Sequence, residues 1–184
     1  PRSTLSSSSA ASDVYKRQLY TLNISINDNA GNSLSNYIST FNIEILQLPP
    51  DPVSIAPEIS PTSSFGLLSS VEFLYTGPNP IQTGMDSSTI DYRRPAVIRG
   101  IVAKENGDPL PGVEITIFKH PEFGQTLSRA DGWFDMVVNG GGKLTVNYKK
   151  TGYLPVKRQK DIPWQDYVII DSVMMVPLLS LIHI

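Results

Sequence analysis

The chain has 184 residues, a formal net charge of −2 at pH 7 and no cysteine. This length suffices for one ordinary domain plus part of another and excludes a large multidomain enzyme. The near-neutral charge predicts neither a nucleic-acid partner nor an anionic membrane, and the missing cysteines exclude disulfides, thiolate nucleophiles and thiolate zinc sites. With 15 prolines and 13 glycines, the composition predicts many turns and few long helices.

The two ends of the chain differ in character from the rest. Residues 1–18, PRSTLSSSSAASDVYKRQ, lack the layout of a signal peptide because no apolar run follows the charged start. They resemble translated sequencing-adapter read-through at the edges of environmental reads, as does the closing SLIHI. We therefore expect residues 1–18 to be an artefact or a disordered arm, residues 179–184 to be an artefact tail, and the natural protein to continue in both directions. The apolar stretch 168–184 is too short and too interrupted to predict a membrane span.

Residues 19–46 contain two runs in which apolar and polar side chains alternate. The first has Tyr20, Leu22, Ile24 and Ile26 on one parity, the sequence DNAGN at 28–32 has turn chemistry, and a second run begins at Phe41. This pattern predicts a pair of half-buried strands, which cannot hold a core alone. It resembles the end of bacterial immunoglobulin-like repeats, so we interpret it as part of such a domain.

Residues 47–96 are rich in proline, serine and threonine, with PPDP at 49–52 and GPNP at 77–80. Proline keeps such a segment extended and fairly stiff, so the composition predicts a linker that holds two domains apart. Only SVEFLYTG, residues 70–77, has the pattern of a strand.

Residues 97–178 show short alternating runs separated by turn signals. Gly107 lies in the first turn, Asp131 and Gly132 in the second, and Gly140, Gly141 and Gly142 in the third. We interpret the Asp131–Gly132 turn as a hairpin whose buried face carries Phe134, Met136 and Val138, and Tyr167–Met175 as the final strand. Six or seven strands without a helical period predict an all-β fold, a small antiparallel β-sandwich.

The strings IRGIV, GDPLPGVEITI, TLSRADGWFDM, KLTVNY and TGY follow one another in this segment. Their order resembles the carboxypeptidase regulatory-like domain, a transthyretin-like (prealbumin-like) sandwich. HPEFGQTLSRADGWFDMVVNGGG followed by IPWQDY resembles more narrowly the version in bacterial Rhs and YD-repeat proteins and in teneurins. The resemblance implies a bacterial cell-surface or secreted protein, in which the domain packs near the base of a large β-shell, contacts other domains of the same polypeptide and performs no chemistry itself.

Four residue groups are candidate sites of chemistry. His120 and Glu122 suggest a metal site but lack further donors. NGGGKLT, residues 139–145, departs from the phosphate-loop pattern at two positions and precedes a strand pattern. Asp131 and Asp135 could form an acid pair or bind calcium, although an aspartate in an Asp-Gly turn ordinarily bonds its own backbone. Ser128 lacks partners for a triad. The sequence therefore predicts no catalytic residue, cofactor or metal.

Trp133, Trp164 and Tyr167 are the candidate interaction surface, because exposed aromatic side chains provide contact area at low entropic cost. The alternative is that Trp164 and Tyr167 close one end of the sandwich. The leading hypothesis is a non-enzymatic structural or interaction module whose outside partner is a surface protein or a glycan. The competing hypotheses are a carbohydrate-binding module using these aromatics and an accessory domain of a zinc carboxypeptidase that binds calcium at Asp131.

Overall fold

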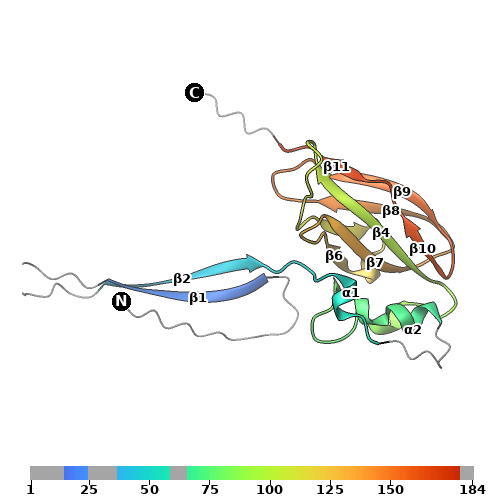
Figure 1. Ribbon diagram of the computed structural model, residues 1–184, viewed down its shortest axis with the longest axis horizontal. Coiled ribbons are helices and arrows are strands. Elements are labelled where there is room, and N and C mark those ends of the chain that lie inside the picture. The colour runs from blue at the N-terminus through green and yellow to red at the C-terminus, as the bar shows by residue number, and fades with distance from the viewer. Residues whose placement is uncertain (1–14, 25–36, 59–65, 179–184) are drawn as a thin grey trace, which may run out of the picture. The chain divides into compact units, whose positions relative to one another are not determined.

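The computed structural model describes residues 15–24, 37–58 and 66–178 (Figure 1). The chain divides into two compact units, Pro1–Gln47 and Leu48–Ile184. The expectations for residues 1–14 and 179–184 and for the turn at 28–32 lie outside the described residues. Within the described ranges, no helix is both long and apolar enough to cross a membrane.

The first unit contains one antiparallel strand pair, as the two alternating runs predict. Strand β1 (Tyr15–Ile24) pairs with β2 (Tyr37–Leu46) in a register that places Tyr20 opposite Phe41. The strand begins at Tyr15, so the last four residues of the expected arm belong to β1.

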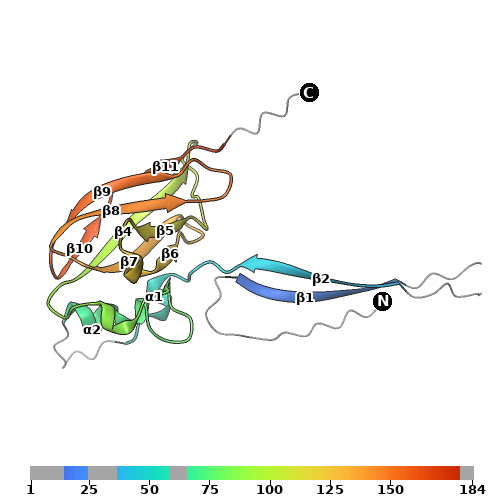
Figure 2. The ribbon, with the colours of Figure 1, turned by 180° about the vertical axis from the view of Figure 1, so that it is seen from behind.

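The second unit is a sandwich of two sheets (Figures 1 and 2). The first sheet is built around β4 (Pro95–Lys104), which pairs antiparallel with β7 (Trp133–Asn139). On its other side, β4 pairs first with β10 (Asp166–Ile169) and then with β11 (Val173–Met175), and both run parallel to it.

The second sheet has five antiparallel strands, in the order β3 (Gln82–Thr83), β6 (Gln125–Leu127), β5 (Glu114–Ile117), β8 (Gly142–Lys149) and β9 (Val156–Ile162). The core lies between the sheets, where Phe134 of β7 meets Tyr148 of β8 edge to face at 5.7 Å. Gly100 makes room for this contact, since a Cβ there would lie 2.7 Å from the Phe134 ring. The predicted all-β sandwich is confirmed.

The connections within the sandwich differ from the prediction in three ways. Asp131 and Gly132 turn the chain from one sheet to the other, because β6 belongs to the second sheet and β7 to the first. The predicted final strand is two strands, β10 and β11, and it is parallel to β4. Strand β9 was not predicted, because its Lys, Arg and Gln residues give no clear apolar alternation.

The predicted linker was wrong for residues 66–95, which pack into the sandwich. This stretch contains α2 (Leu67–Val71), the 3₁₀ turns η1 (Glu72–Leu74) and η2 (Ser87–Thr89), and strand β3; α1 (Pro52–Ile55) precedes it, and η3 (Pro121–Phe123) lies later in the chain. The predicted strand at 70–77 is thus mostly helical. Helix α2 contacts β4 and η1 contacts β7. Five side chains of the stretch join the hydrophobic core: Val71, Leu74, Tyr75, Ile81 and Ile90. The apolar residues between the prolines of this stretch pack against the sandwich, and the composition of the segment does not predict this packing.

Candidate functional site

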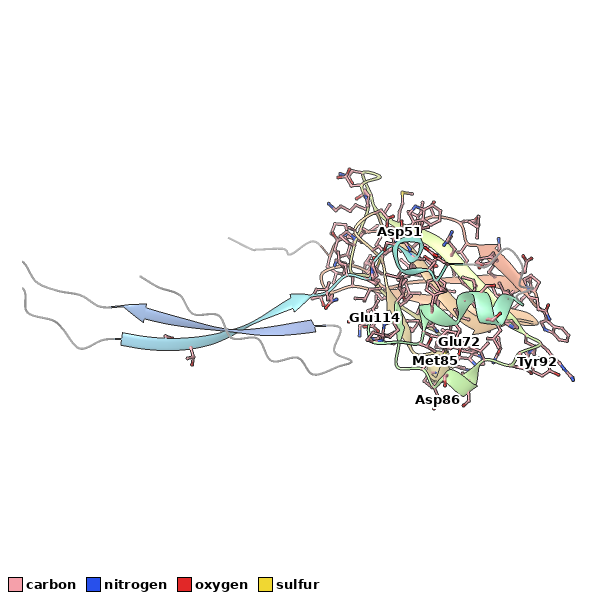
Figure 3. All side chains as sticks on the ribbon, turned by 60° about the horizontal axis from the view of Figure 1, so that its bottom comes forward. Asp51, Glu72, Met85, Asp86, Tyr92 and Glu114 are labelled. Carbon is pink, nitrogen blue, oxygen red and sulfur yellow. The ribbon has the colours of Figure 1, made fainter. Side chains whose placement is uncertain are left out.

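Two strand starts that are far apart in sequence lie side by side at one end of the sandwich. Strands β4 and β10 run parallel with Ala96 opposite Asp166, so the segments that precede them are neighbours. We call the residues gathered there the arginine–aromatic end, which comprises Tyr92, Arg93, Arg94, Trp164 and Tyr167. Figure 3 shows Tyr92 at the periphery of the second unit.

Hydrogen bonds from backbone and side-chain groups hold the loops of this end together. The Gln165 N–H donates to the Pro95 carbonyl at 2.7 Å, and the Gln165 side-chain amide donates to the Arg93 carbonyl at 3.3 Å. The Arg94 guanidinium donates from Nε (2.9 Å) and Nη2 (2.7 Å) to the Gly140 carbonyl, while the Gly140 N–H donates to the Arg94 carbonyl at 2.7 Å. The loop between β7 and β8 is therefore tied to both strand starts.

Two glycines of that loop determine where Trp164 lies. A Cβ on Gly141, whose φ is +104°, would lie 1.9 Å from the indole Nε1, and a Cβ on Gly140 would lie 2.0 Å from the Pro163 carbonyl oxygen. Of Gly140, Gly141 and Gly142, Gly141 alone has a positive φ. At Gly140 a glycine is required instead because the Pro163 carbonyl lies close to its backbone. The Trp164 indole thus packs against the backbone of Gly141, and 59% of the residue remains exposed.

Each arginine of this end stacks on an aromatic ring. The Arg94 guanidinium carbon lies 6.0 Å from the centroid of Trp164, and that of Arg93 lies 5.1 Å from the centroid of Tyr92. Tyr92 is 66% exposed, and its hydroxyl accepts a hydrogen bond from Arg93 Nε. Such stacking limits the conformations of a guanidinium while leaving its other N–H groups accessible.

Tyr167 lies on the outer face of β10 and is 52% exposed. Partial burial raises the pKa of its phenol; Asp135 adds to the rise and Arg99 opposes it. The side chain is therefore neutral near pH 7 and presents an apolar ring with one hydroxyl.

Asp135 of β7 is the centre of an ion-pair network in the same sheet as Tyr167. Asp135 is fully buried and accepts hydrogen bonds from Arg99 Nε and Arg129 Nη1, both at 2.5 Å. Both of its carboxylate oxygens thus contact a guanidinium, which satisfies a charge that would otherwise be costly to bury. This arrangement leaves Asp135 no role as a calcium ligand or as half of an acid pair.

The comparisons with known proteins identify the type of sandwich. A family model described as the teneurin TTR-like domain matches residues 90–175. These residues form a transthyretin-like domain of the teneurin type. Teneurin-3 of Danio rerio is 31% identical over 130 residues, which are 68% of this chain and 5% of that protein. Teneurin-m of Drosophila melanogaster is 44% identical over 87 residues, which are 47% of this chain and 3% of that protein.

The chain spans 5% or less of the length of these relatives, and both are animal proteins. The solved structure of catechol 1,2-dioxygenase from Acinetobacter sp. ADP1 aligns over 53% of this chain and 57% of that one, with a TM-score of 0.39 and 10% identity. A likeness this low supports no statement about activity. The match to the teneurin-type domain begins before residue 97, the start predicted from sequence, and so includes Tyr92, Arg93 and Arg94.

The three predicted aromatics do not share one surface of the teneurin-type domain. Trp133 opens β7 opposite Ile101, whereas Trp164 packs on the loop that follows the other end of β7. The seven residues of that strand extend for roughly 20 Å. Trp164 and Tyr167 belong to the same end, and Trp133 does not. Sequence analysis missed Tyr92, Arg93 and Arg94, although three consecutive residues of types common at interfaces were a usable signal.

The other candidate groups have structural roles in this domain. Ser128 Oγ is buried, donates to the Leu110 carbonyl (2.7 Å) and accepts from the Val113 N–H (2.8 Å). Lys143 is the second residue of β8 and pairs with Asp161 of β9, where a phosphate loop would require a helix. Asp131 accepts from the Trp133 N–H at 3.0 Å, as expected for an Asp-Gly turn, and Gly107 and Gly132 both have positive φ.

His120 and Glu122 form an exposed pair. Their Nδ1 and Oε1 atoms are 2.8 Å apart, and this hydrogen bond lowers the pKa of Glu122. Within the described ranges, no group of three or more His, Cys, Asp or Glu side chains could hold a metal ion. The pair offers two donors, where a zinc site needs three or four.

Proposed function

We propose that the chain contributes a non-enzymatic structural and interaction module to a much longer cell-surface or secreted protein, and that the module docks through its arginine–aromatic end. One observation carries the proposal. Trp164 remains mostly exposed although glycines, an arginine and a cross-strand hydrogen bond fix the loop beneath it. A preformed exposed patch of Trp, Tyr and Arg has the composition of binding hot spots.

The polar groups that could support catalysis have other tasks. Asp135 pairs with two guanidiniums, and Ser128 links two backbone segments. A nucleophile or general base needs a partner within hydrogen-bond reach that orients it toward a substrate. The module therefore acts by binding, and the large size of its teneurin relatives favours other domains of the same polypeptide as partners.

Two finer assignments complete the proposal. The bacterial Rhs or YD-repeat context rests on the strings HPEFGQTLSRADGWFDMVVNGGG and IPWQDY. The assignment of residues 19–46 to the end of an immunoglobulin-like domain is supported by their alternating pattern and by the antiparallel pairing of β1 with β2. The complete reading frame would test both assignments, because it should encode further sandwich strands upstream and YD repeats downstream.

Site-specific cross-linking tests the docking role. We would place the photoreactive residue p-benzoylphenylalanine at position 164 of the longer polypeptide and, as the matched control, at position 118. Phe118 is also an exposed aromatic, but it follows β5 in the other sheet. We expect a discrete cross-linked product from position 164 and none from position 118. Equal cross-linking at both positions, or none at either, would refute docking through the arginine–aromatic end.

A further inference from the structure

Four of the five arginines of the second unit form two pairs that differ in their partners, and the fifth, Arg158, donates to the Lys157 carbonyl. Arg99 and Arg129 each bind the Asp135 carboxylate, as described above. Arg93 and Arg94 have no carboxylate within ion-pair distance among the described residues. Two acids lie near them in sequence, but Asp91 accepts from the Arg93 N–H (2.9 Å) and Asp166 from the Tyr167 N–H (2.8 Å). An exposed and a half-buried guanidinium thus lie at the surface proposed for docking without a carboxylate partner in the described part of the chain.

We propose that the arginine–aromatic end binds an acidic segment of a protein, with one carboxylate at each guanidinium and an apolar side chain against Trp164 and Tyr167. This inference rests on the proposed docking function and names the chemistry of the partner. Charge complementarity carries it, because a guanidinium has donors and no acceptor and so requires a partner rich in acceptor oxygens.

The remaining donors of each arginine favour carboxylates over sugar hydroxyls. Arg93 uses Nε on Tyr92, and Arg94 uses Nε and Nη2 on Gly140. Among the described residues, the terminal nitrogens of Arg93 and Nη1 of Arg94 have no hydrogen-bond partner. A carboxylate offers two coplanar oxygens that match the two terminal nitrogens of Arg93, and its full charge makes its bonds to both arginines stronger than those of a neutral sugar hydroxyl. The stacked rings hold both guanidiniums in place before binding, which lowers the entropic cost of the contact.

Titration of the 184-residue chain with short peptides tests the inference. The probes are acetyl-hexaglutamate amide and its uncharged analogue acetyl-hexaglutamine amide, followed by the indole and guanidinium N–H signals in ¹⁵N NMR spectra. Trp133 provides an internal reference because it lies at the other end of β7. We expect hexaglutamate to shift the Trp164, Arg93 and Arg94 signals, to leave Trp133 unchanged, and to bind about tenfold more weakly at 0.5 M than at 0.05 M salt.

Two variants that each remove one positive charge separate a specific contact from a general attraction. Arg93→Gln should weaken hexaglutamate binding about tenfold. Lys119→Gln is the matched control, because Lys119 lies beside Phe118 in the turn after β5 of the other sheet, and should leave the affinity unchanged. The hydrogen bonds to the Gly140 carbonyl come from Arg94, so replacement of Arg93 should preserve the fold, which the unchanged spectrum of the free variant would verify.

The possible failures are distinguishable. Equal shifts of Trp164 with both peptides would overturn the acidic partner and leave docking through this end intact. Equal losses for the two variants, or no shift at Trp164 at peptide concentrations of about 10 mM, would overturn the inference. Preferential binding of a sulfated hexasaccharide over hexaglutamate would overturn it in favour of an acidic glycan. The cross-linking experiment at position 164 remains an independent test of docking itself.

Discussion

At the scale of single residues, the exposure of Trp164 depends on the absence of a side chain at position 141. Gly141→Ala should lower the free energy of unfolding by about 1–2 kcal/mol, because an L-residue is strained at positive φ, and should displace the indole that contacts the backbone there. Gly142→Ala is the matched control, since a Cβ at Gly142 meets nothing within 4 Å, and should change stability by less than about 0.5 kcal/mol. Urea denaturation and the Trp164 indole N–H shift would measure both effects. Equal stabilities, with the indole signal unmoved, would show that Gly141 does not position Trp164.

At the scale of secondary-structure elements, a single side chain replaces a strand at the free edge of β7. Gln82, in the two-residue strand β3, is buried; its Oε1 accepts from the Val137 N–H at 2.6 Å, and its Nε2 donates to the carbonyls of Val137 (2.9 Å) and Phe123 (2.7 Å). Gln82→Leu should destabilise the domain by about 2–4 kcal/mol, because these buried backbone groups lose their partner. It should also accelerate hydrogen exchange of the Val137 amide. The exposed Gln159→Leu in β9 is the control and should be nearly neutral. A neutral Gln82→Leu would mean that water or rearranged backbone satisfies the edge of β7.

Strand β7 and its neighbours show which parts of the fold the sequence could predict and which it could not. Alternation revealed β8, in which buried and more exposed side chains alternate. The same pattern marked β4 and β7, although both of these strands are buried on both faces over most of their length. It could not reveal that β6 and β7 belong to different sheets, since a turn signal such as Asp131–Gly132 does not specify the strands that pair on either side of it. The contribution of Gln82 depends on a contact 55 residues away in sequence. Likewise, the arginine–aromatic end depends on the parallel pairing of β4 with β10, so Trp164 was predicted as a candidate and Arg94 was not.

At the scale of the whole molecule, the folding unit should be larger than the sandwich strands alone. Residues 66–90 bury Val71, Leu74, Tyr75, Ile81 and Ile90 in the same core as the strands, and each buried side chain of this kind contributes about 1.5–3 kcal/mol. Their sum is comparable to the total stability of an ordinary domain, roughly 5–15 kcal/mol. A fragment of residues 97–178, the boundary predicted from sequence, should therefore fail to unfold cooperatively. A fragment of residues 48–178 should melt within about 5 °C of the full chain, because the first 47 residues form a separate compact unit. Calorimetry and the dispersion of amide signals in NMR spectra would distinguish the two fragments. A cooperative transition of 97–178 near that of 48–178 would show instead that the preceding segment only covers a sandwich that is stable without it.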